Sequence, residues 1–525
     1  MDWKSVIALA MVICTLGAIP VMSEEPARGL SKVRINAPTP SVKNEQLPPP
    51  KAEDTAKPLE PEIRVELSVP RVATLSSAPP IKALELLEVL SSVNRHFPLL
   101  KAALQEREIA LGNAISADGL FDTQLKGHVR QNQGSFDSQR YALSFSQPTA
   151  FQGISFGGGW RLGAGIYPVY YQDRQTAEGG EFFGGVTVPL LKDREIDFRR
   201  AGRRRASLDR QIAEPLIASQ HVRFVRDASW AYWNWVAAAK RLEIGKELLR
   251  IAEGRDELLR KQAKLGRIAE IEVTDNRRTV LDRRARLVRI QRDFELASYT
   301  LSLFVRDEKG VPIHLASARL APEIPTPAKP SEKELIEGVH VALANRPELA
   351  QLRLQIKRMG VDLDLAKNQT LPDLRLFVNH ATDVGEEKKS LDRYAYEAGV
   401  LLEVPFQRRQ AIGQIRTTRA RLAQLFAQDA FLRESITTDV QKAVAQLIRA
   451  YEVSVRTREV VRLAEIMEKA EQRKLELGRS TVLIVNLREL ARADAQAQVV
   501  DALADYFRAW AAYRASLGLS FLPRK

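Results

Sequence analysis

The sequence of 525 residues contains one cysteine, Cys14, six histidines and few aromatic residues, 7% of the chain. Without a second cysteine the chain forms no internal disulfide, so its stability must come from its core, from assembly or from both. The histidines show no ligand spacing, and G-x-S-x-G and H-E-x-x-H motifs are absent. The glycine run FGGGW at 156–160 lacks the Lys-Ser/Thr of a phosphate loop. These absences indicate a protein without a catalytic centre, metal site or cofactor.

Long apolar runs are absent after the first 25 residues, so the sequence predicts no transmembrane helix there. The N-terminus has Lys4, an apolar run over residues 6–22, and then Ser23 before two glutamates. This order is typical of a secretory signal peptide, placed at residues 1–23; a retained membrane anchor is the alternative. The residue before Cys14 is isoleucine, not the small residue of a lipoprotein signal, so acylation of Cys14 is not favoured.

The chain is basic, with a net charge of +14. Such a charge often indicates nucleic-acid binding, but an exported chain seldom meets nucleic acid. The densest basic stretch, six arginines between residues 194 and 205, resembles a helix start. It favours a solvated helix or a membrane-surface contact, and we expect no nucleic-acid partner.

Two proline-rich segments divide the rest of the chain. Residues 24–83 combine proline with charge and lack apolar periodicity, which predicts a disordered or extended segment. A second stretch, 320–333, has the composition of a linker. The regions on either side, 84–319 and 334–520, repeat the same order of features, and a short tail, 521–525, follows.

Each region begins with a predicted helix of about 35 residues, carrying VNRHFPLL in the first and ANRPELAQL in the second. Strand-like sequence follows and ends in a Val-Pro pair, at Pro189 and at Pro405. Next come a helical stretch of about 65 to 70 residues, which stops at Gly266 or Gly478, and a helix of about 37 residues. The prolines are 216 residues apart and the glycines 212, so we interpret the chain as two tandem copies of one unit.

The strand-like segments alternate apolar or small residues with polar ones, as in residues 123–130, 140–146, 154–166 and 396–404. One charged face and one hydrocarbon face fit a wall between lipid and water, but a soluble sandwich with one wet face has the same periodicity. There are about two strands per region, plus extra hairpin sequence in the first. So few strands cannot close a membrane barrel, and an open edge in lipid is not tolerated. A chain that spans a membrane with these strands must therefore oligomerise.

The long helices would extend about 100 Å, which is too long for a compact domain and suits a coiled-coil-like cylinder. The two shorter helices of each region together match that length and are expected to pair with the long one. Pro215 should kink or break the first long helix. The cluster WAYWNW at 230–235 has helical spacing and predicts packing between helices rather than a ligand cage.

Two kinds of position are candidate sites. Pro189 and Pro405 would mark where a strand ends and a long helix begins, because proline ends ladder pairing and is tolerated at a helix start. Gly266 and Gly478 would form the tips of helical hairpins. Charged residues beside these tips would ring a pore opening or, in the simpler reading, only be solvated: Arg267, Glu272 and Arg479.

With these features, the sequence resembles the TolC-like outer membrane efflux proteins (outer membrane factors) over about residues 84–520. The resemblance is carried by ANRPEL, LPDLRL, DASWAYWNWVAA, the Val-Pro junctions and the two LGR turns. It implies a mixed α/β membrane protein, a homotrimer in which each chain gives four strands to a twelve-stranded outer membrane β-barrel. A long α-helical coiled-coil tunnel would cross the periplasm, and its tips would dock on a periplasmic adaptor joined to an inner membrane transporter or secretion ATPase.

Two features depart from the family pattern. The family often has an acidic residue six positions after the tip glycine, where it helps to close the entrance. Glu272 fits this pattern, whereas the second repeat has Ile484. The sequence therefore argues against an entrance held shut by acidic residues from both repeats, although Arg267 and Arg479 could contribute charge. The first region also carries additional strand-rich sequence at about 134–180, which we expect to extend the barrel or its outer loops.

The resemblance therefore implies a passive exit duct in the outer membrane of a Gram-negative-type bacterium, extending into the periplasm and embedded in outer membrane lipid. Drugs, metal ions and secreted proteins all leave through ducts of this design, with specificity set mostly by the pump. One alternative is a periplasmic coiled-coil scaffold or adaptor without a barrel. Another, a basic nucleic-acid-binding coiled coil, requires that the first 23 residues are not a signal.

Overall fold

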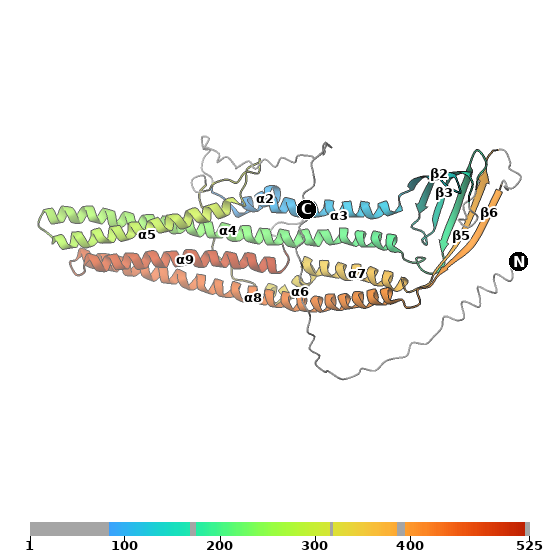
Figure 1. The fold of residues 1–525 in the computed structure, drawn as a ribbon. Helices are drawn as coiled ribbons and strands as arrows, with labels where there is room; N and C mark the ends of the chain where they lie inside the picture. The colour runs from blue at the N-terminus through green and yellow to red at the C-terminus, as the bar shows by residue number, and fades with distance from the viewer. Residues whose placement is uncertain (1–82, 168–174, 316–318, 386–393, 520–525) are drawn as a thin grey trace, which may run out of the picture. The chain divides into compact units, whose positions relative to one another are not determined.

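The structure is a computed structural model that describes residues 83–167, 175–315, 319–385 and 394–519. The predicted signal peptide with Cys14, nearly all of the segment 24–83 and the tail 521–525 lie outside the described residues. All described residues belong to one compact unit. Within it a β-sheet lies at one end of a set of long helices, and two helical hairpin turns lie at the other end (Figure 1).

The first half of the chain is built around one long helix. The helices α2 (Leu86–His96) and α3 (Pro98–Asp118) and a short 3-10 helix, η1 (Gly119–Phe121), precede the strands. After the strands, α4 (Phe198–Lys264) has 67 residues, as the sequence predicts, and α5 (Glu270–Ser302) returns along it. Both α3 and α5 pack on α4, one beyond the other along its length (Figure 1).

The second half has the same order of elements. The pair α6 (Glu332–Asn345) and α7 (Pro347–Asn368) precedes two strands, and α8 (Arg409–Glu476) and α9 (Val482–Ser516) follow them. The 68 residues of α8 again match the prediction, and α7 and α9 both pack on α8. Contacts of α4 with α7 and with α9 join the two halves.

Two details of the predicted helices are wrong. The first helix of each region is not continuous: it breaks at Phe97 and at Arg346, which take extended backbone conformations before Pro98 and Pro347. Proline disfavours the α conformation in the residue before it, so both breaks follow from the sequence. Conversely, α4 continues through Pro215 without the break, since the packing of a helix this long outweighs the loss of one backbone hydrogen bond, and a kink there stays a prediction.

The strands of the described residues form one antiparallel sheet in the order β1-β2-β3-β4-β5-β6. The first half supplies β1 (Gln124–Asn132), β2 (Ser138–Pro148), β3 (Ser155–Gly165) and β4 (Glu181–Pro189), and the second supplies β5 (Asp373–Asp383) and β6 (Tyr394–Glu403). The sheet of the described residues thus has two more strands than the four per chain that the family resemblance implies for the barrel. The extra hairpin, β2–β3, comes from the strand-rich segment 134–180.

Two apolar cores hold the helices together near the breaks between the short helices. In the first, Trp235 of α4 is fully buried, and Trp233 stacks on Phe507 of α9 with ring centroids 4.3 Å apart. The second joins α6, α8 and α9 around Ile436 and Leu447. The tryptophan cluster thus packs between helices, as predicted. Across the described ranges no helix combines the length and apolarity needed to cross a membrane.

Candidate channel sites

The six strands present two chemically different faces. Because side chains alternate along each strand and the register keeps like faces together, apolar residues line one side of all six strands. One row across the sheet reads Gly127, Leu143, Trp160, Phe182, Thr382 and Tyr394. The opposite side carries Lys126, Arg161 and Glu397, among other polar residues.

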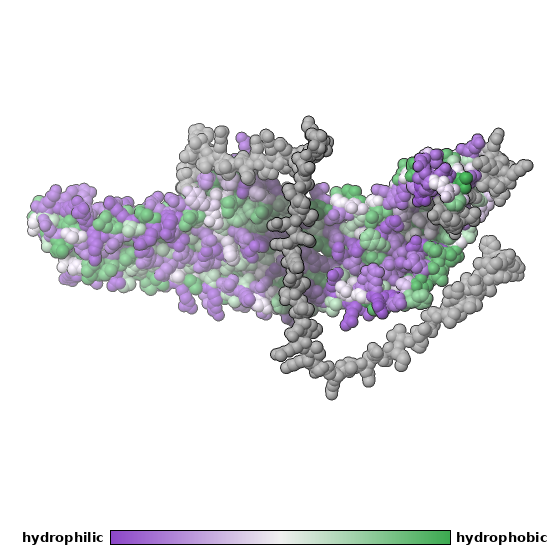
Figure 2. All heavy atoms as spheres, viewed as in Figure 1, coloured by the Kyte–Doolittle hydropathy of each residue, from purple (hydrophilic) through white to green (hydrophobic). Residues whose placement is uncertain are grey.

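The apolar face is the more exposed one. Leu125 is 71% exposed, Val400 59% and Tyr396 80%. Along β2 and β5, residues of the apolar face are exposed while their neighbours on the polar face are mostly half-buried. A soluble sandwich would cover its apolar face, so the arrangement fits contact with lipid instead. Over the helices, by contrast, Figure 2 shows a largely hydrophilic surface in this view.

Aromatic side chains lie at both ends of the strands. Phe182, Tyr394 and Tyr396 are exposed at the end away from the helices, and His380 stacks on Tyr396 with ring centroids 4.6 Å apart. Near the helices, Phe151 lies in the turn between β2 and β3, and Phe406 follows β6; they are 68% and 90% exposed. Aromatic girdles at the two interfaces are typical of membrane β-barrels.

The first strand-to-helix junction is held by the buried Arg200. The last residue of β4 is Pro189, and α4 begins at Phe198 behind the N-cap Asp197, whose carboxylate accepts a hydrogen bond from the Arg200 amide. The Arg200 guanidinium bonds the other Asp197 oxygen at 2.8 Å. It also donates to the backbone carbonyls of residues 193, 194 and 195. One side chain thus satisfies three backbone carbonyls at the point where the chain reverses direction between sheet and helix.

This junction also ties the two halves together. Asp193 has a left-handed backbone conformation, with φ of 64°, and its amide donates to the Asn368 side chain at the end of α7. Burial raises the pKa of the Asp193 carboxyl, an effect that the neighbouring Lys192 opposes. Lys192 pairs in turn with Asp373, the first residue of β5, at 3.6 Å.

The second junction is built differently. Pro405 lies two residues beyond the end of β6, and α8 begins at Arg409 without a side-chain cap. Arg408 before it is left-handed, with φ of 48°. A cavity of about 620 Å³ is lined by Pro405 and Arg408 from this junction and by Lys192 from the other, so the two junctions are neighbours. Any mechanistic role of Pro189 and Pro405 stays a prediction.

The two hairpin tips share one backbone design. Gly266 and Gly478 have φ of +70° and +72°. In each, the glycine amide bonds a carbonyl three residues back, and the following arginine amide bonds one five residues back. This is the Schellman motif, which suits glycine because the left-handed conformation is unfavourable for other residues.

The predicted tip residues Arg267, Glu272 and Arg479 are all exposed. Within the described chain, neither arginine forms an ion pair. Glu272 lies in the first turn of α5, where its charge complements the helix dipole. Ile484 lies in the first turn of α9, 39% exposed, so the second tip is less acidic. Large apolar side chains at the two tips are also exposed: Leu265, Ile271, Leu477 and Leu483.

The substitution Gly478→Ala tests the tip design. The left-handed backbone should cost about 1 kcal/mol with a Cβ present, so the amides of the turn should exchange with deuterium about fivefold faster. Hydrogen–deuterium exchange with mass spectrometry measures this effect. The matched control is Gly254→Ala, at an exposed α4 position with nothing within 4 Å of the added Cβ, which should stabilise the helix. Unchanged exchange at the Gly478→Ala tip would contradict this account.

The sequence analysis did not identify a buried charge cluster near the tips. Glu489 of α9 is fully buried, and its carboxylate accepts hydrogen bonds from Arg255 of α4 and Arg283 of α5. Oxygen Oε2 lies 3.0 Å from the Arg255 guanidinium and 3.1 Å from that of Arg283. Arg283 also donates to the Leu248 carbonyl at 2.8 Å. Three helices thus meet at one carboxylate, which links the α4–α5 hairpin to the α8–α9 hairpin.

Further ion pairs surround this cluster. Arg286 of α5 pairs with Asp494 of α9, and Arg492 of α9 pairs with Glu468 of α8 at 2.6 Å. Burial raises the pKa of Glu468, which Arg492 counteracts. Burial also lowers the pKa of Arg283, and its bond to Glu489 opposes that change. The hairpins are therefore joined by charge near the tips and by aromatic packing further along.

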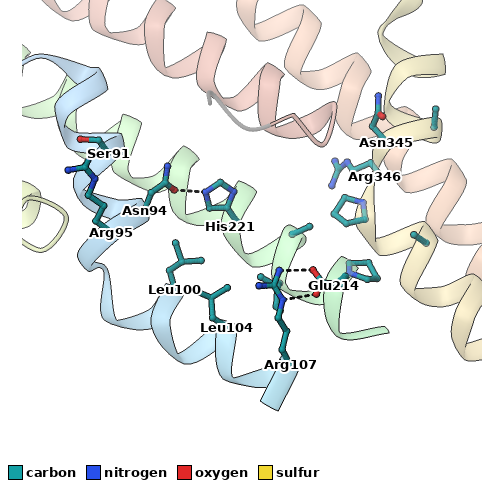
Figure 3. A pocket seen from close by; sticks show the side chains of 16 residues that line it. Ser91, Asn94, Arg95, Leu100, Leu104, Arg107, Glu214, His221, Asn345 and Arg346 are labelled. Atoms are coloured by element: carbon teal, nitrogen blue, oxygen red, sulfur yellow. Dashed lines mark hydrogen bonds and ion pairs between the residues drawn. The ribbon is translucent and has the colours of Figure 1, made fainter. Parts of the chain in front are cut away.

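The cavity in Figure 3 lies at the breaks between the short helices. Its volume is about 1050 Å³, and residues from α2, α3, α4, α6 and α7 line it. Two pairs of its polar groups contact each other: Arg107 binds Glu214 through two bonds of 2.6 and 2.8 Å, and His221 lies 2.7 Å from Asn94. Among the residues that the structure describes, no group of side chains suits a metal ion.

No protein-family model and no curated protein matches the sequence. Solved structures, by contrast, align with the structure of this chain. The outer membrane protein VceC of Vibrio cholerae aligns with a TM-score of 0.61 over 83% of this chain and 97% of its own, at 17% identity. The chain has the fold of an outer membrane channel.

Two further solved structures have a similar fold. The Neisseria gonorrhoeae MtrE outer membrane channel, in its open state, aligns with a TM-score of 0.60 over 85% of this chain and 94% of its own, at 14% identity. The Campylobacter jejuni CmeC outer membrane channel gives a TM-score of 0.59 over 82% and 85%, at 12% identity. At such identities the likeness is one of fold, and it agrees with the family resemblance that the sequence motifs carry.

Proposed function

We propose that the protein is a passive exit duct of the outer membrane. Three copies would close their sheets into one β-barrel in the lipid, and their helices would form a tunnel about 100 Å long through the periplasm. The observation that carries this proposal is the exposed apolar face of the sheet, flanked by aromatic residues and joined directly to hairpins with a hydrophilic surface. The fold shared with outer membrane channels supports it.

The hairpin tips would be the entrance of this duct. Their exposed leucines and isoleucines would dock on a periplasmic adaptor, which would connect the duct to an inner membrane transporter or a secretion ATPase. Energy would come from these partners, so the duct itself needs neither a cofactor nor catalytic chemistry. The transported molecule would be selected by the pump.

Detergent extraction and mass measurement test the proposal. The protein should sediment with the outer membrane, require detergent for extraction, and have the mass of three chains by native mass spectrometry. A soluble monomer in the periplasm would instead support a coiled-coil scaffold or adaptor without a barrel. The exposed sheet face speaks against that alternative, because a soluble adaptor would present an apolar wall to water.

The substitution Glu272→Ala tests the entrance. If three Glu272 side chains surround the opening, their loss should change the conductance of single channels in a planar bilayer by about twofold and weaken cation selectivity. Glu270→Ala is the matched control, because this residue lies in the same exposed first turn of α5 but projects from another side of the helix. Equal conductance for wild type and Glu272→Ala would remove Glu272 from the mechanism.

A further inference from the structure

The extra hairpin β2–β3 has the dimensions of a membrane-spanning element. Both strands have 11 residues, against 9 to 11 in β1, β4, β5 and β6. A tilted strand needs about 9 to 11 residues to cross the hydrocarbon core of a bilayer. The hairpin is therefore long enough to cross the lipid wherever its neighbours do.

The two faces of the sheet continue through this hairpin without a change of register. Leu143 of β2 faces Gly127 of β1 on one side and Trp160 of β3 on the other, and Trp160 faces Phe182 of β4. All four lie on the apolar side. A hairpin that left the wall as an outer loop would not need to place its apolar residues on the lipid side of both neighbouring strands.

The turn between β2 and β3 lies at the base of the sheet, against the strand-to-helix junction. Gly153 in this turn is so close to the junction that an added Cβ would lie 2.4 Å from the Asp193 carbonyl oxygen and 2.9 Å from Cγ of Pro189. The hairpin thus returns to the level at which β4 ends and α4 is about to begin. An outer loop would stay at the opposite end of the sheet.

We propose that β2–β3 is part of the membrane wall and that each chain contributes six strands to the barrel, closed between β6 of one copy and β1 of the next. This inference rests on the proposed function for its membrane and its three copies. Three sheets of six strands give eighteen strands in place of the twelve that the family resemblance implies. The wall radius would then be about 18 Å rather than about 12 Å, at a strand spacing of 4.8 Å and a tilt of 40°.

The two outer strands suit each other as neighbours. In the sheet of one chain β1 and β6 are the edges, and they run in opposite directions. Their apolar faces lie on the same side of the sheet, so joining β6 to the β1 of a second copy continues both faces. On the polar face β1 carries Lys126 and Arg130, whereas β6 carries Glu397 and Glu403. Opposite charges across a strand pair favour this contact over β1–β1 or β6–β6 pairing.

Spin labels at single cysteines test the position of the hairpin. In a Cys14→Ser background, Leu143→Cys and Ser144→Cys place labels on opposite faces of β2, and Val378→Cys and Asn379→Cys do so on β5. In liposomes, labels at positions 143 and 378 should be relaxed by oxygen from the lipid, and those at 144 and 379 by a water-soluble nickel complex, with a severalfold difference within each pair.

The label pair on β2 and the label pair on β5 distinguish failure of the proposed hairpin position from failure of the proposed membrane duct. If positions 378 and 379 alternate while 143 and 144 are both reached by the nickel complex, the hairpin lies outside the wall and the eighteen-stranded barrel is wrong, although the duct remains. If all four labels are reached only by the nickel complex, the membrane barrel itself is wrong and this inference fails with it.

Disulfide trapping tests the contact between copies. His128→Cys on β1 is combined in turn with Ala395→Cys, Glu397→Cys or Leu401→Cys on the polar face of β6, and mild oxidation should convert at least one combination to covalent trimers on a non-reducing gel. Because β1 and β6 are opposite edges of one sheet, a bond between them must join two copies. The pair His128→Cys with Asn379→Cys on β5 is the control and should stay monomeric. Monomers for all three β6 combinations would overturn the β6–β1 contact.

Discussion

A chain carrying Glu489→Gln is expected to form channels that open more readily than the wild type. The substitution removes the carboxylate charge that binds the guanidinium groups of Arg255 and Arg283 between the two hairpins. Removing one partner of a buried ion pair costs about 3 to 5 kcal/mol. Two helical hairpins can avoid this cost by separating, which hydrates both arginines. The conductance of purified channels in a planar bilayer should therefore rise severalfold.

Two variants control this experiment. Glu253→Gln also removes a carboxylate partner of an arginine, Arg284, but that pair is exposed and lies within the α4–α5 hairpin, so conductance should stay at the wild-type value. Replacing Arg255, Arg283 and Glu489 together by methionine removes all three charges of the cluster and should restore a closed tip, because apolar packing can substitute for a buried ionic cluster. A Glu489→Gln channel as tight as the wild type would show that the hairpins are held together elsewhere.

Replacing Arg200 by methionine should prevent correct assembly of the channel. Methionine fills similar volume but leaves the carbonyls of residues 193, 194 and 195 and one Asp197 oxygen without their donor. Unsatisfied buried acceptors cost about 1 to 3 kcal/mol each, so a loss of about 3 to 5 kcal/mol is reasonable even with partial solvation. The sheet would then no longer be fixed on the helices, and little trimer should reach the outer membrane.

Heat-modifiable migration of the trimer on gels measures the loss of assembly, and thermal melting in detergent measures the loss of stability. Arg204→Met is the control: this residue lies one helical turn further along α4, is exposed, and should assemble like the wild type. Arg200→Lys should also fail in part, because an ammonium group cannot reach acceptors on three sides as a planar guanidinium does. Normal trimer yield for Arg200→Met would show that the backbone holds the junction by itself.

Many features of the fold depend only on residues close together in the sequence, which explains why the sequence predicted them. The four alternating segments 123–130, 140–146, 154–166 and 396–404 each form a strand within two residues of the predicted bounds, and the long helices end just before the two glycines as predicted. The effect of a proline on the residue before it is equally local. The first helix of each region was predicted as continuous because its helical periodicity runs on past Phe97 and Arg346. The prolines that follow these two residues nevertheless break it.

The contacts that join distant segments were not predictable in this way. Glu489, Arg255 and Arg283 each look like a solvated helix residue in the sequence, and only the packing of three helices brings them to one buried point. Similarly, Arg200 is one of six arginines in a basic stretch that composition assigns to a solvated surface. Its side chain is buried because the chain reverses direction around it.

The sequence by itself determined the alternation of the strands, the length of the helices and the glycine tips, since each depends on residues close together in the chain. Only the tertiary structure decided that the strands number six in one sheet, and that charge joins the hairpins near their tips. The pairing of β4 with β5 and the buried ion pairs depend on which residues meet across about two hundred positions of the chain. Neither periodicity nor composition contains that information.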